Sequence, residues 1–135
     1  MPVGIAAEVK EAYETITAPG AEPAIVWATF VRSGGTVVLG TSGSDHDAFL
    51  AALPQDGTAF AYYRLNIVTD GSPPTKFAFI TWAGEGASPL KKGRLSIDKA
   101  ELKQVIKEIS VEIATSDLDD LAYERIEGKV RAANY

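Results

Sequence analysis

The chain has 135 residues, of which 46% are hydrophobic and 23% are charged, and it carries a formal net charge of −5. Such a chain is typical of one globular domain covering residues 1–135. It contains no cysteine, which excludes disulfides, thiolate nucleophiles and cysteine-containing metal sites. The acidic balance argues against general nucleic-acid binding, because phosphate contacts require a basic surface.

No targeting segment or membrane span is expected from the sequence. Glu8, Lys10 and Glu11 interrupt the apolar core that a signal peptide requires. No apolar run approaches the ~20 residues that cross a bilayer, and neither end matches a lipidation motif. We therefore expect a soluble, cytoplasmic protein.

The first part of the chain predicts a helix followed by a β-hairpin. Apolar residues at spacings of three and four predict an amphipathic helix over 5–16, which Pro19-Gly20 would end. Residues 24–31 and 36–39 are rich in β-branched and aromatic side chains and predict the two strands of a hairpin. The glycine-containing segment 40–43 is predicted to be a loop.

The middle of the chain predicts a short helix and two more strands. Ser44 or Asp45 would cap the helix, which runs to Leu53 and is closed by a proline. Strands are predicted over 58–68 and 75–83. The segment between them, 69–74, holds a glycine and two prolines and is predicted to be a loop.

The last third predicts a long helix, a strand and a final helix. After the loop 84–89, Asp98 with Glu101 three residues later has the spacing of a capping box, and the helix is predicted to open there. A strand is predicted over 110–115, followed by a helix that Asp117 caps and that runs to about Val130. The inward side of the long helix would be formed by Leu102, Val105, Ile106 and Ile109.

This order of elements predicts an α/β fold. A strand reached through a helical crossover tends to pair in parallel. We therefore expect a mixed central sheet of about five strands with helices on both faces. Trp27 and Trp82 lie within apolar strands, and we expect both to fill the core.

Charge is distributed unevenly along the chain. Residues 76–107 hold seven basic and three acidic side chains, a net charge of +4, so the rest of the chain carries −9. Lys99, Lys103 and Lys107 are spaced four apart and predict a stripe on one side of the long helix. A solvated helix face is the common explanation of such a stripe, but further basic residues precede it. We therefore predict a basic face that meets an acidic partner, formed by Lys76, Lys91, Lys92, Arg94, Lys99, Lys103 and Lys107.

No pattern in the sequence supports catalysis. Ser44, Asp45 and His46 have the residue types of a hydrolytic triad, but neighbours in sequence cannot supply its geometry. Asp117, Asp119 and Asp120 could offer oxygen ligands to Mg²⁺ or Ca²⁺, although helix capping explains them better. The glycine-rich loops match no nucleotide-binding fingerprint. We predict no catalytic residue, no metal site, no cofactor and no enzymatic activity.

Four strings of the sequence resemble the coactosin-like branch of the ADF/cofilin homology proteins. They are AIVWATF at 24–30, KFAFITWAGE at 76–85, DKAELK at 98–103 and ANY at 133–135. The resemblance extends over nearly the whole chain, and the second string is long enough to be specific. It implies one ADF/cofilin homology domain with a five-stranded mixed sheet, and a cytoskeletal protein that binds actin without catalysis.

The resemblance also implies roles for individual residues. Lys76 would be the leading actin contact, and the helix that carries Lys99 and Lys103 would dock on an actin subunit. Coactosins bind the sides of filaments and sever them poorly, so filamentous actin is favoured as the partner. Segment 2–9 lacks the serine whose phosphorylation switches off ADF/cofilin relatives. The alternatives are a cofilin-like protein that binds monomeric actin or depolymerises filaments, and a module that binds anionic phosphoinositides through the same lysines.

Overall fold

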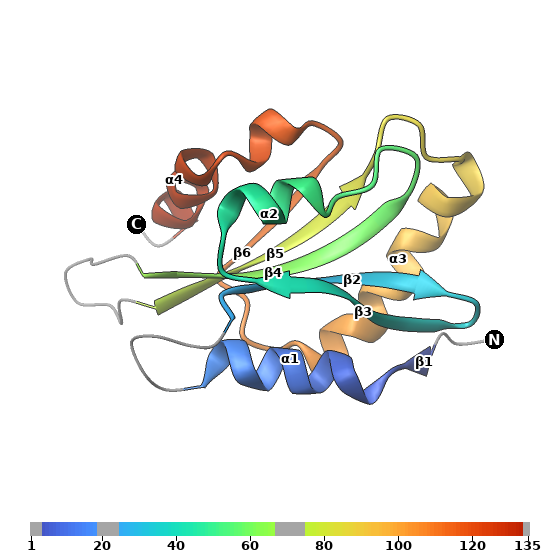
Figure 1. Cartoon of the computed structure of the whole chain (residues 1–135), viewed down its shortest axis with the longest axis horizontal. Helices are drawn as coiled ribbons and strands as arrows, with labels where there is room; N and C mark the ends of the chain where they lie inside the picture. Colours follow the sequence, from blue (N-terminus) through green and yellow to red (C-terminus); the bar gives the residue numbers. More distant parts are fainter. Residues whose placement is uncertain (1–3, 19–24, 67–74, 134–135) are drawn as a thin grey trace.

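The computed structural model describes residues 4–18, 25–66 and 75–133. Its centre is a six-stranded sheet with the order β1-β3-β2-β4-β5-β6, and Figure 1 shows helices above and below it. The elements, in chain order, are β1 (Gly4–Ile5), α1 (Ala7–Thr17), β2 (Trp27–Ser33), β3 (Thr36–Gly43), α2 (His46–Ala51), β4 (Thr58–Asn66), β5 (Thr75–Ala83), α3 (Pro89–Val105), β6 (Val111–Thr115), the 3₁₀ helix η1 (Leu118–Leu121) and α4 (Tyr123–Ala133).

The sheet is mixed, as the sequence predicts. β2 pairs with β3 and β4 in antiparallel register, and β4 pairs with β5 in the same way. β6, reached through α3, runs parallel to β5, with Ile113 beside Ile80. The expected parallel pairing across a helical crossover is therefore confirmed.

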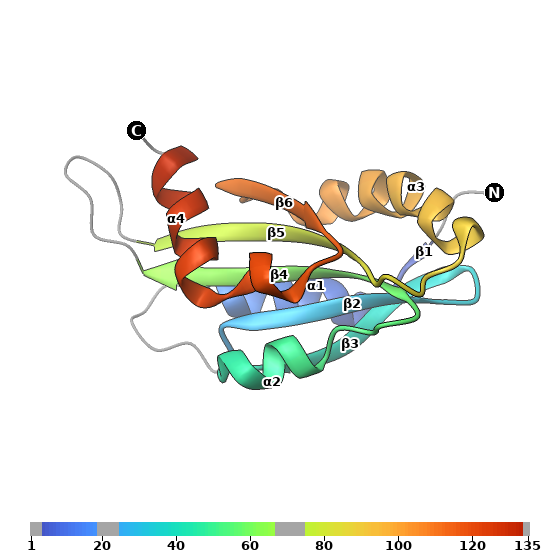
Figure 2. The ribbon, with the colours of Figure 1, turned by 90° about the horizontal axis from the view of Figure 1, so that it is seen from above.

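Each face of the sheet has its own hydrophobic cluster. On one face, Phe49 of α2, Leu121 of η1 and Ile126 of α4 pack against the strands. On the other, Val9 of α1 and Leu102 of α3 do so. Figures 1 and 2 show the same layers, with α2 and α4 on one side of the sheet and α1 on the other. The predicted arrangement of helices on both faces is confirmed.

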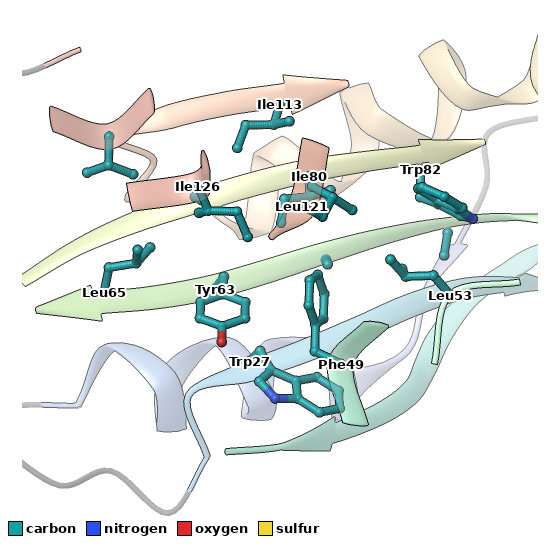
Figure 3. Close-up of a cluster of buried hydrophobic side chains, with 14 residues drawn as sticks. Trp27, Phe49, Leu53, Tyr63, Leu65, Ile80, Trp82, Ile113, Leu121 and Ile126 are labelled. Carbon is teal, nitrogen blue, oxygen red and sulfur yellow. The ribbon is translucent and has the colours of Figure 1, made fainter. Parts of the chain in front are cut away.

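Both tryptophans lie in the core, as predicted. Trp27 and Trp82 belong to the cluster beneath α2 and α4, drawn in Figure 3. Each indole N–H also has a partner: Trp27 Nε1 donates to the carbonyl of Asp45 at 3.0 Å, and Trp82 Nε1 donates to that of Pro54 at 2.7 Å. A buried tryptophan is stable when its indole N–H has a hydrogen-bond partner. These two bonds therefore hold the segments that contain Asp45 and Pro54 against the core.

Several predicted boundaries are confirmed closely. Asp45 caps α2, because its carboxylate accepts from the backbone N–H of Ala48 at 3.0 Å. β5 and β6 match the predicted strands within a residue. The helix-ending Pro19-Gly20, the last two residues of the predicted strand 58–68 and the predicted loop 69–74 lie outside the described residues.

Two predictions about the first sheet edge are wrong. The sheet has a sixth strand, because Gly4–Ile5, predicted in part as helix, pairs in parallel with Thr36 and Val37 of β3. The predicted loop 40–43 is the continuation of β3. A glycine at position 40 is explained by close packing and not by a turn. A Cβ there would lie 2.7 Å from Thr29 Oγ1, too close for a side chain.

The predicted start of the long helix is also wrong. α3 begins nine residues before Asp98, at Pro89, where Ser88 accepts a hydrogen bond from the N–H of Lys91 at 3.2 Å. Proline at the first helical position is favoured because it has no N–H to leave unsatisfied. Asp98 is not a cap but a buried residue of the second half of the helix.

The two C-terminal helical predictions need smaller corrections. α3 ends at Val105, so Lys107 and Ile109 follow the helix instead of belonging to it. Asp117 caps a helix as predicted, but this helix is η1, and its carboxylate accepts from Asp119 N at 2.9 Å. The chain then leaves helical geometry at Ala122, and α4 starts at Tyr123.

Candidate functional site

Two of the predicted basic residues lie beside the sheet edge and share one acidic neighbour. Lys99 and Lys103 of α3 approach the carboxylate of Glu112 in β6, with Nζ–O distances of 2.9 and 2.7 Å. These two bonds hold the pKa of Glu112 below its ordinary value. One carboxylate against two ammonium groups leaves one net positive charge, and all three side chains stay partly exposed.

The first turns of α3 carry the next group of basic residues. Lys91, Lys92 and Arg94 are exposed, and Lys91 Nζ donates to the backbone carbonyl of Asp56 at 3.4 Å. Lys107 is exposed beyond the end of the helix, where its backbone N–H donates to the hydroxyl of Tyr13. The predicted stripe is therefore broken, because Lys107 does not continue the line of Lys99 and Lys103.

Lys76 lies apart from the lysines of α3. It belongs to β5 and alternates with Ala78 and Ile80, which pack on the face covered by α2, η1 and α4. α3 packs on the opposite face through Leu102, and Ile106, directly after the helix, packs on the same face. The predicted basic residues thus lie on both sides of the sheet, and the structure does not gather them on one face.

The surroundings of Lys76 are unusual for a lysine. Only 9% of the residue is exposed, and its ammonium makes no hydrogen bond or ion pair with any residue in the described part of the chain. Lys76 Nζ is not among the buried side-chain atoms without a partner in the described residues, so the ammonium reaches solvent at the end of a covered stem. It is therefore a candidate contact for an outside anion.

An apolar strip that was not predicted from the sequence lies on the outer side of α3. Leu90 and Ile97 are 64% and 54% exposed. They are seven residues apart and so lie on the same side of a helix that turns about 100° per residue. Between them, Gly93 has open space where a Cβ would stand. The available signal was this seven-residue spacing, out of phase with the inward Leu102 and Ile106.

One basic side chain borders this strip. At about 100° per residue, Arg94 lies about 40 to 60° around the helix from Leu90 and Ile97, whereas Lys92, Lys99 and Lys103 lie on the opposite side of the helix. Exposed apolar side chains with a charged neighbour are typical of a protein interface. α3 is therefore the strongest candidate for a protein-binding element.

The rejected catalytic and metal hypotheses gain no support from the geometry. His46 Nδ1 is 2.9 Å from the Tyr63 hydroxyl and Nε2 is 3.0 Å from the Leu121 carbonyl, so both ring nitrogens have structural partners. Burial raises the pKa of Tyr63 to about 12, which keeps this hydroxyl protonated at neutral pH. Among the described residues, no three His, Cys, Asp or Glu side chains are grouped to hold a metal ion.

The described helices are also unsuited to a bilayer. None of them combines the length and the apolar composition that a transmembrane span needs. The longest described helix, α3, instead carries the charged residues discussed above.

Comparison with known proteins identifies the class to which this fold and surface belong. Residues 2–131 match the family model of the cofilin/tropomyosin-type actin-binding proteins. Since the match covers nearly the whole chain, the protein belongs to this family. The resemblance drawn from the four sequence strings is confirmed.

Within the family, the chain is similar to coactosins. It is 37% identical to coactosin of Dictyostelium discoideum over 130 residues, covering 94% of this chain and 88% of the relative. The crystal structure of human coactosin-like protein superposes with a TM-score of 0.87 at 30% identity, covering 96% of this chain and 98% of that one. The solution structure of mouse coactosin, described as an actin filament binding protein, gives a TM-score of 0.83 at 31% identity, covering 98% and 93%.

Proposed function

We propose that this protein binds filamentous actin along the side of the filament, as a non-catalytic, cytoplasmic component of the cytoskeleton that severs filaments poorly. Family membership supports actin as the partner. The mouse relative described as an actin filament binding protein supports the filament over the monomer. The observation that carries the proposal is the division of the basic residues between the two sides of the sheet.

Two separate contact regions suit a filament better than a monomer. Lys76 lies on the face beneath α4, and the lysines of α3 lie on the other. A single flat contact could not use both regions at once. Neighbouring subunits along a filament can approach one small domain from two directions, so each region would meet a different subunit.

The two regions contribute different interactions. On α3, the exposed Leu90 and Ile97 would supply apolar contact area, and the nearby Arg94 and Lys91 would supply charge. Lys92, Lys99 and Lys103 lie on the opposite side of the helix and, together with Lys107, would act by steering at long range. At the second region, the ammonium of Lys76 would form a charge-assisted contact with an acidic partner on actin.

The test is co-sedimentation with filamentous actin at low and moderate salt. Lys76→Met keeps most of the side-chain volume and removes the charge, and we expect it to weaken binding by tenfold or more, about the effect of losing a central interface residue. Lys10→Met, on the exposed side of α1, is the matched control and should bind as the original protein does. Binding should weaken as salt rises, because charge contributes to it.

The outcomes separate the proposed function from its alternatives. Unchanged pelleting of Lys76→Met would refute the assignment of Lys76. Actin that appears in the supernatant would instead indicate a monomer-binding or depolymerising protein. If neither the protein nor actin changes its distribution, the actin proposal fails.

A further inference from the structure

An exposed serine stands directly before α3. Ser88 has an extended backbone, and its hydroxyl oxygen caps the helix by accepting a hydrogen bond from the N–H of Lys91 at 3.2 Å. Pro89 follows it at the first helical position, and Lys91 is the third residue after it. A serine followed by proline, any residue and lysine is the substrate pattern of the cyclin-dependent class of proline-directed protein kinases.

The sequence contains one other serine that precedes a proline. This is Ser72, but the third residue after it is Thr75, which carries no charge. No threonine of the chain is followed by proline. Ser88 is therefore the one residue of this sequence that matches the whole pattern, and Ser72 provides an internal comparison.

The helix that follows Ser88 is weakly held at its start. A protein kinase binds its substrate in an extended conformation, so the first turn of α3 has to unwind for Lys91 to reach the enzyme. Every residue from 88 to 94 is exposed, so this stretch gains little stability from the core. Gly93 lowers its helix propensity further. The first buried residue of the helix, Asp98, lies beyond the turn that has to open.

We propose that Ser88 is phosphorylated by a proline-directed kinase and that the phosphate lowers the affinity of α3 for actin. In this reaction the Ser88 hydroxyl oxygen forms a bond to the γ-phosphorus of ATP, and the bond from that phosphorus to the β,γ-bridging oxygen breaks. ADP leaves with the electron pair of the broken bond. The hydroxyl proton passes to the catalytic base of the kinase.

The surroundings of Ser88 suit a phosphate once it is attached. An anion is stabilised at the N-terminus of a helix, so α3 would remain folded. Lys91 and Lys92 follow at spacings of three and four, which are neighbouring positions on a helix. Lys91 Nζ forms no ion pair with the described residues and donates at 3.4 Å to the backbone carbonyl of Asp56. Its ammonium is therefore free to turn to the phosphate.

Phosphorylation would change the charge that α3 presents to a partner. A phosphoserine carries a charge of about −2 at neutral pH, so the net charge of residues 76–107 would fall from +4 to about +2. The phosphate would pair with Lys91 and repel an acidic protein. The expected loss of actin binding rests on the proposed function. The modification itself does not, so it is measured without actin.

The first test measures phosphate transfer to the full chain from Mg²⁺ and ATP by a purified cyclin-dependent kinase. Mass spectrometry gives the stoichiometry and the position of the phosphate, which we expect on Ser88. Ser88→Asn keeps a capping side chain and should abolish transfer to this position. Ser72→Ala should leave it unchanged.

The contribution of the lysine is tested in the same assay. Lys91→Met should slow phosphate transfer about tenfold, the effect of losing one charge-assisted contact. The adjacent Lys92→Met, which lies outside the pattern, is the matched control and should react as the original protein does. Circular dichroism and a thermal melt establish that each variant is folded.

The second test compares Ser88→Asp with Ser88→Asn in co-sedimentation with filamentous actin. Both side chains cap helices, so the two variants differ in charge and not in the start of α3. We expect Ser88→Asn to bind as the original protein does and the phosphorylated protein to bind about tenfold more weakly at low salt. Ser88→Asp, with a single charge, should lie between them.

The remaining outcomes overturn one part of the proposal or the other. Phosphate on Ser72 in place of Ser88, no transfer at all, or a rate that Lys91→Met leaves unchanged overturns the site. Equal binding of actin by the phosphorylated and unmodified proteins overturns the effect on actin. If the unmodified protein does not bind actin, the proposed function fails and the effect on actin fails with it, whereas transfer to Ser88 still establishes the modification site.

Discussion

The ion pair of Arg32 and Asp98 illustrates how burial changes the effect of a charge on the stability of the fold. Asp98 is the more deeply buried partner, with a side chain 5% exposed against 23% for Arg32. Burial raises the pKa of the Asp98 carboxyl, although Arg32 and Arg94 oppose the shift. Removing the arginine should therefore be more harmful than removing the acid, because it leaves the buried charge alone.

We predict that Arg32→Met lowers the free energy of unfolding by about 3 kcal/mol at neutral pH. Since the pKa of Asp98 is raised in the folded protein, its protonated form is favoured there, and stability is lost as pH rises through that pKa. The defect of Arg32→Met should therefore shrink at acidic pH and in the double variant with Asp98→Asn. Urea unfolding over a pH series measures both effects, and a defect independent of pH would contradict the argument.

Glu112 provides the opposite case, an acid whose pKa is lowered. Its bonds to Lys103 and Lys99 hold the pKa of its carboxyl below the ordinary 4.5. The stabilisation is present above pH 4.5 and is lost as pH falls through the lowered pKa. We expect the unfolding free energy of Glu112→Gln to fall less steeply than that of the original protein across this acidic window. Equal slopes for the two proteins would show that the lysines do not stabilise the carboxylate.

At the scale of the element, α3 has one side that packs in the core and an exposed side that we propose binds actin. Leu102 is fully buried against the sheet, whereas Ile97 is more than half exposed on the outer strip. We predict that Leu102→Ala lowers the free energy of unfolding by about 3 kcal/mol, as in other buried leucine truncations. Ile97→Asp should leave it nearly unchanged and weaken co-sedimentation with actin. Paired urea unfolding and sedimentation assays test both sides, and a destabilised Ile97→Asp would place this residue in the core.

The elements that the sequence predicts well are those whose local signals and burial agree. β5 is mostly apolar from Phe77 to Ala83, and Asp45 stands directly before the helix that it caps. The start of α3 was mispredicted because two signals competed. Asp98 and Glu101 have the spacing of a capping box, yet Ser88 and Pro89 provide the true cap, and Asp98 is buried by its partner on a distant strand.

The candidate site was less predictable than the fold. Spacing along a helix identified the lysines, but pairing of Lys99 and Lys103 with Glu112 depends on the parallel contact between β5 and β6. The two-residue strand β1 has no pattern long enough to detect. Likewise, Lys76 and α3 lie on opposite sides of the sheet because alternate residues of β5 point to opposite faces. A count of charges along the chain does not show this separation.

At the scale of the whole molecule, the sheet divides the charge that the sequence concentrates in one segment. α1 and α3 cover one face, and α2, η1 and α4 cover the other. Figure 2 shows α3 and α4 at separate places on the molecule. If Lys76 and α3 both contact actin, each region can be tested separately. Contacts that share no neighbouring residues contribute nearly independently to the binding free energy.

We therefore predict that variants of the two regions differ between monomeric and filamentous actin. The apolar strip of α3 and Arg94 beside it would bind one subunit alone, so Ile97→Asp combined with Arg94→Met should weaken binding to both forms of actin. Lys76 would meet a second subunit that exists only in the filament, so Lys76→Met should weaken filament binding and leave monomer binding unchanged. Fluorescence titration of labelled monomeric actin, together with filament co-sedimentation, measures the two affinities. If Lys76→Met reduces both equally, the two regions contact the same subunit and the filament-specific role of Lys76 is wrong.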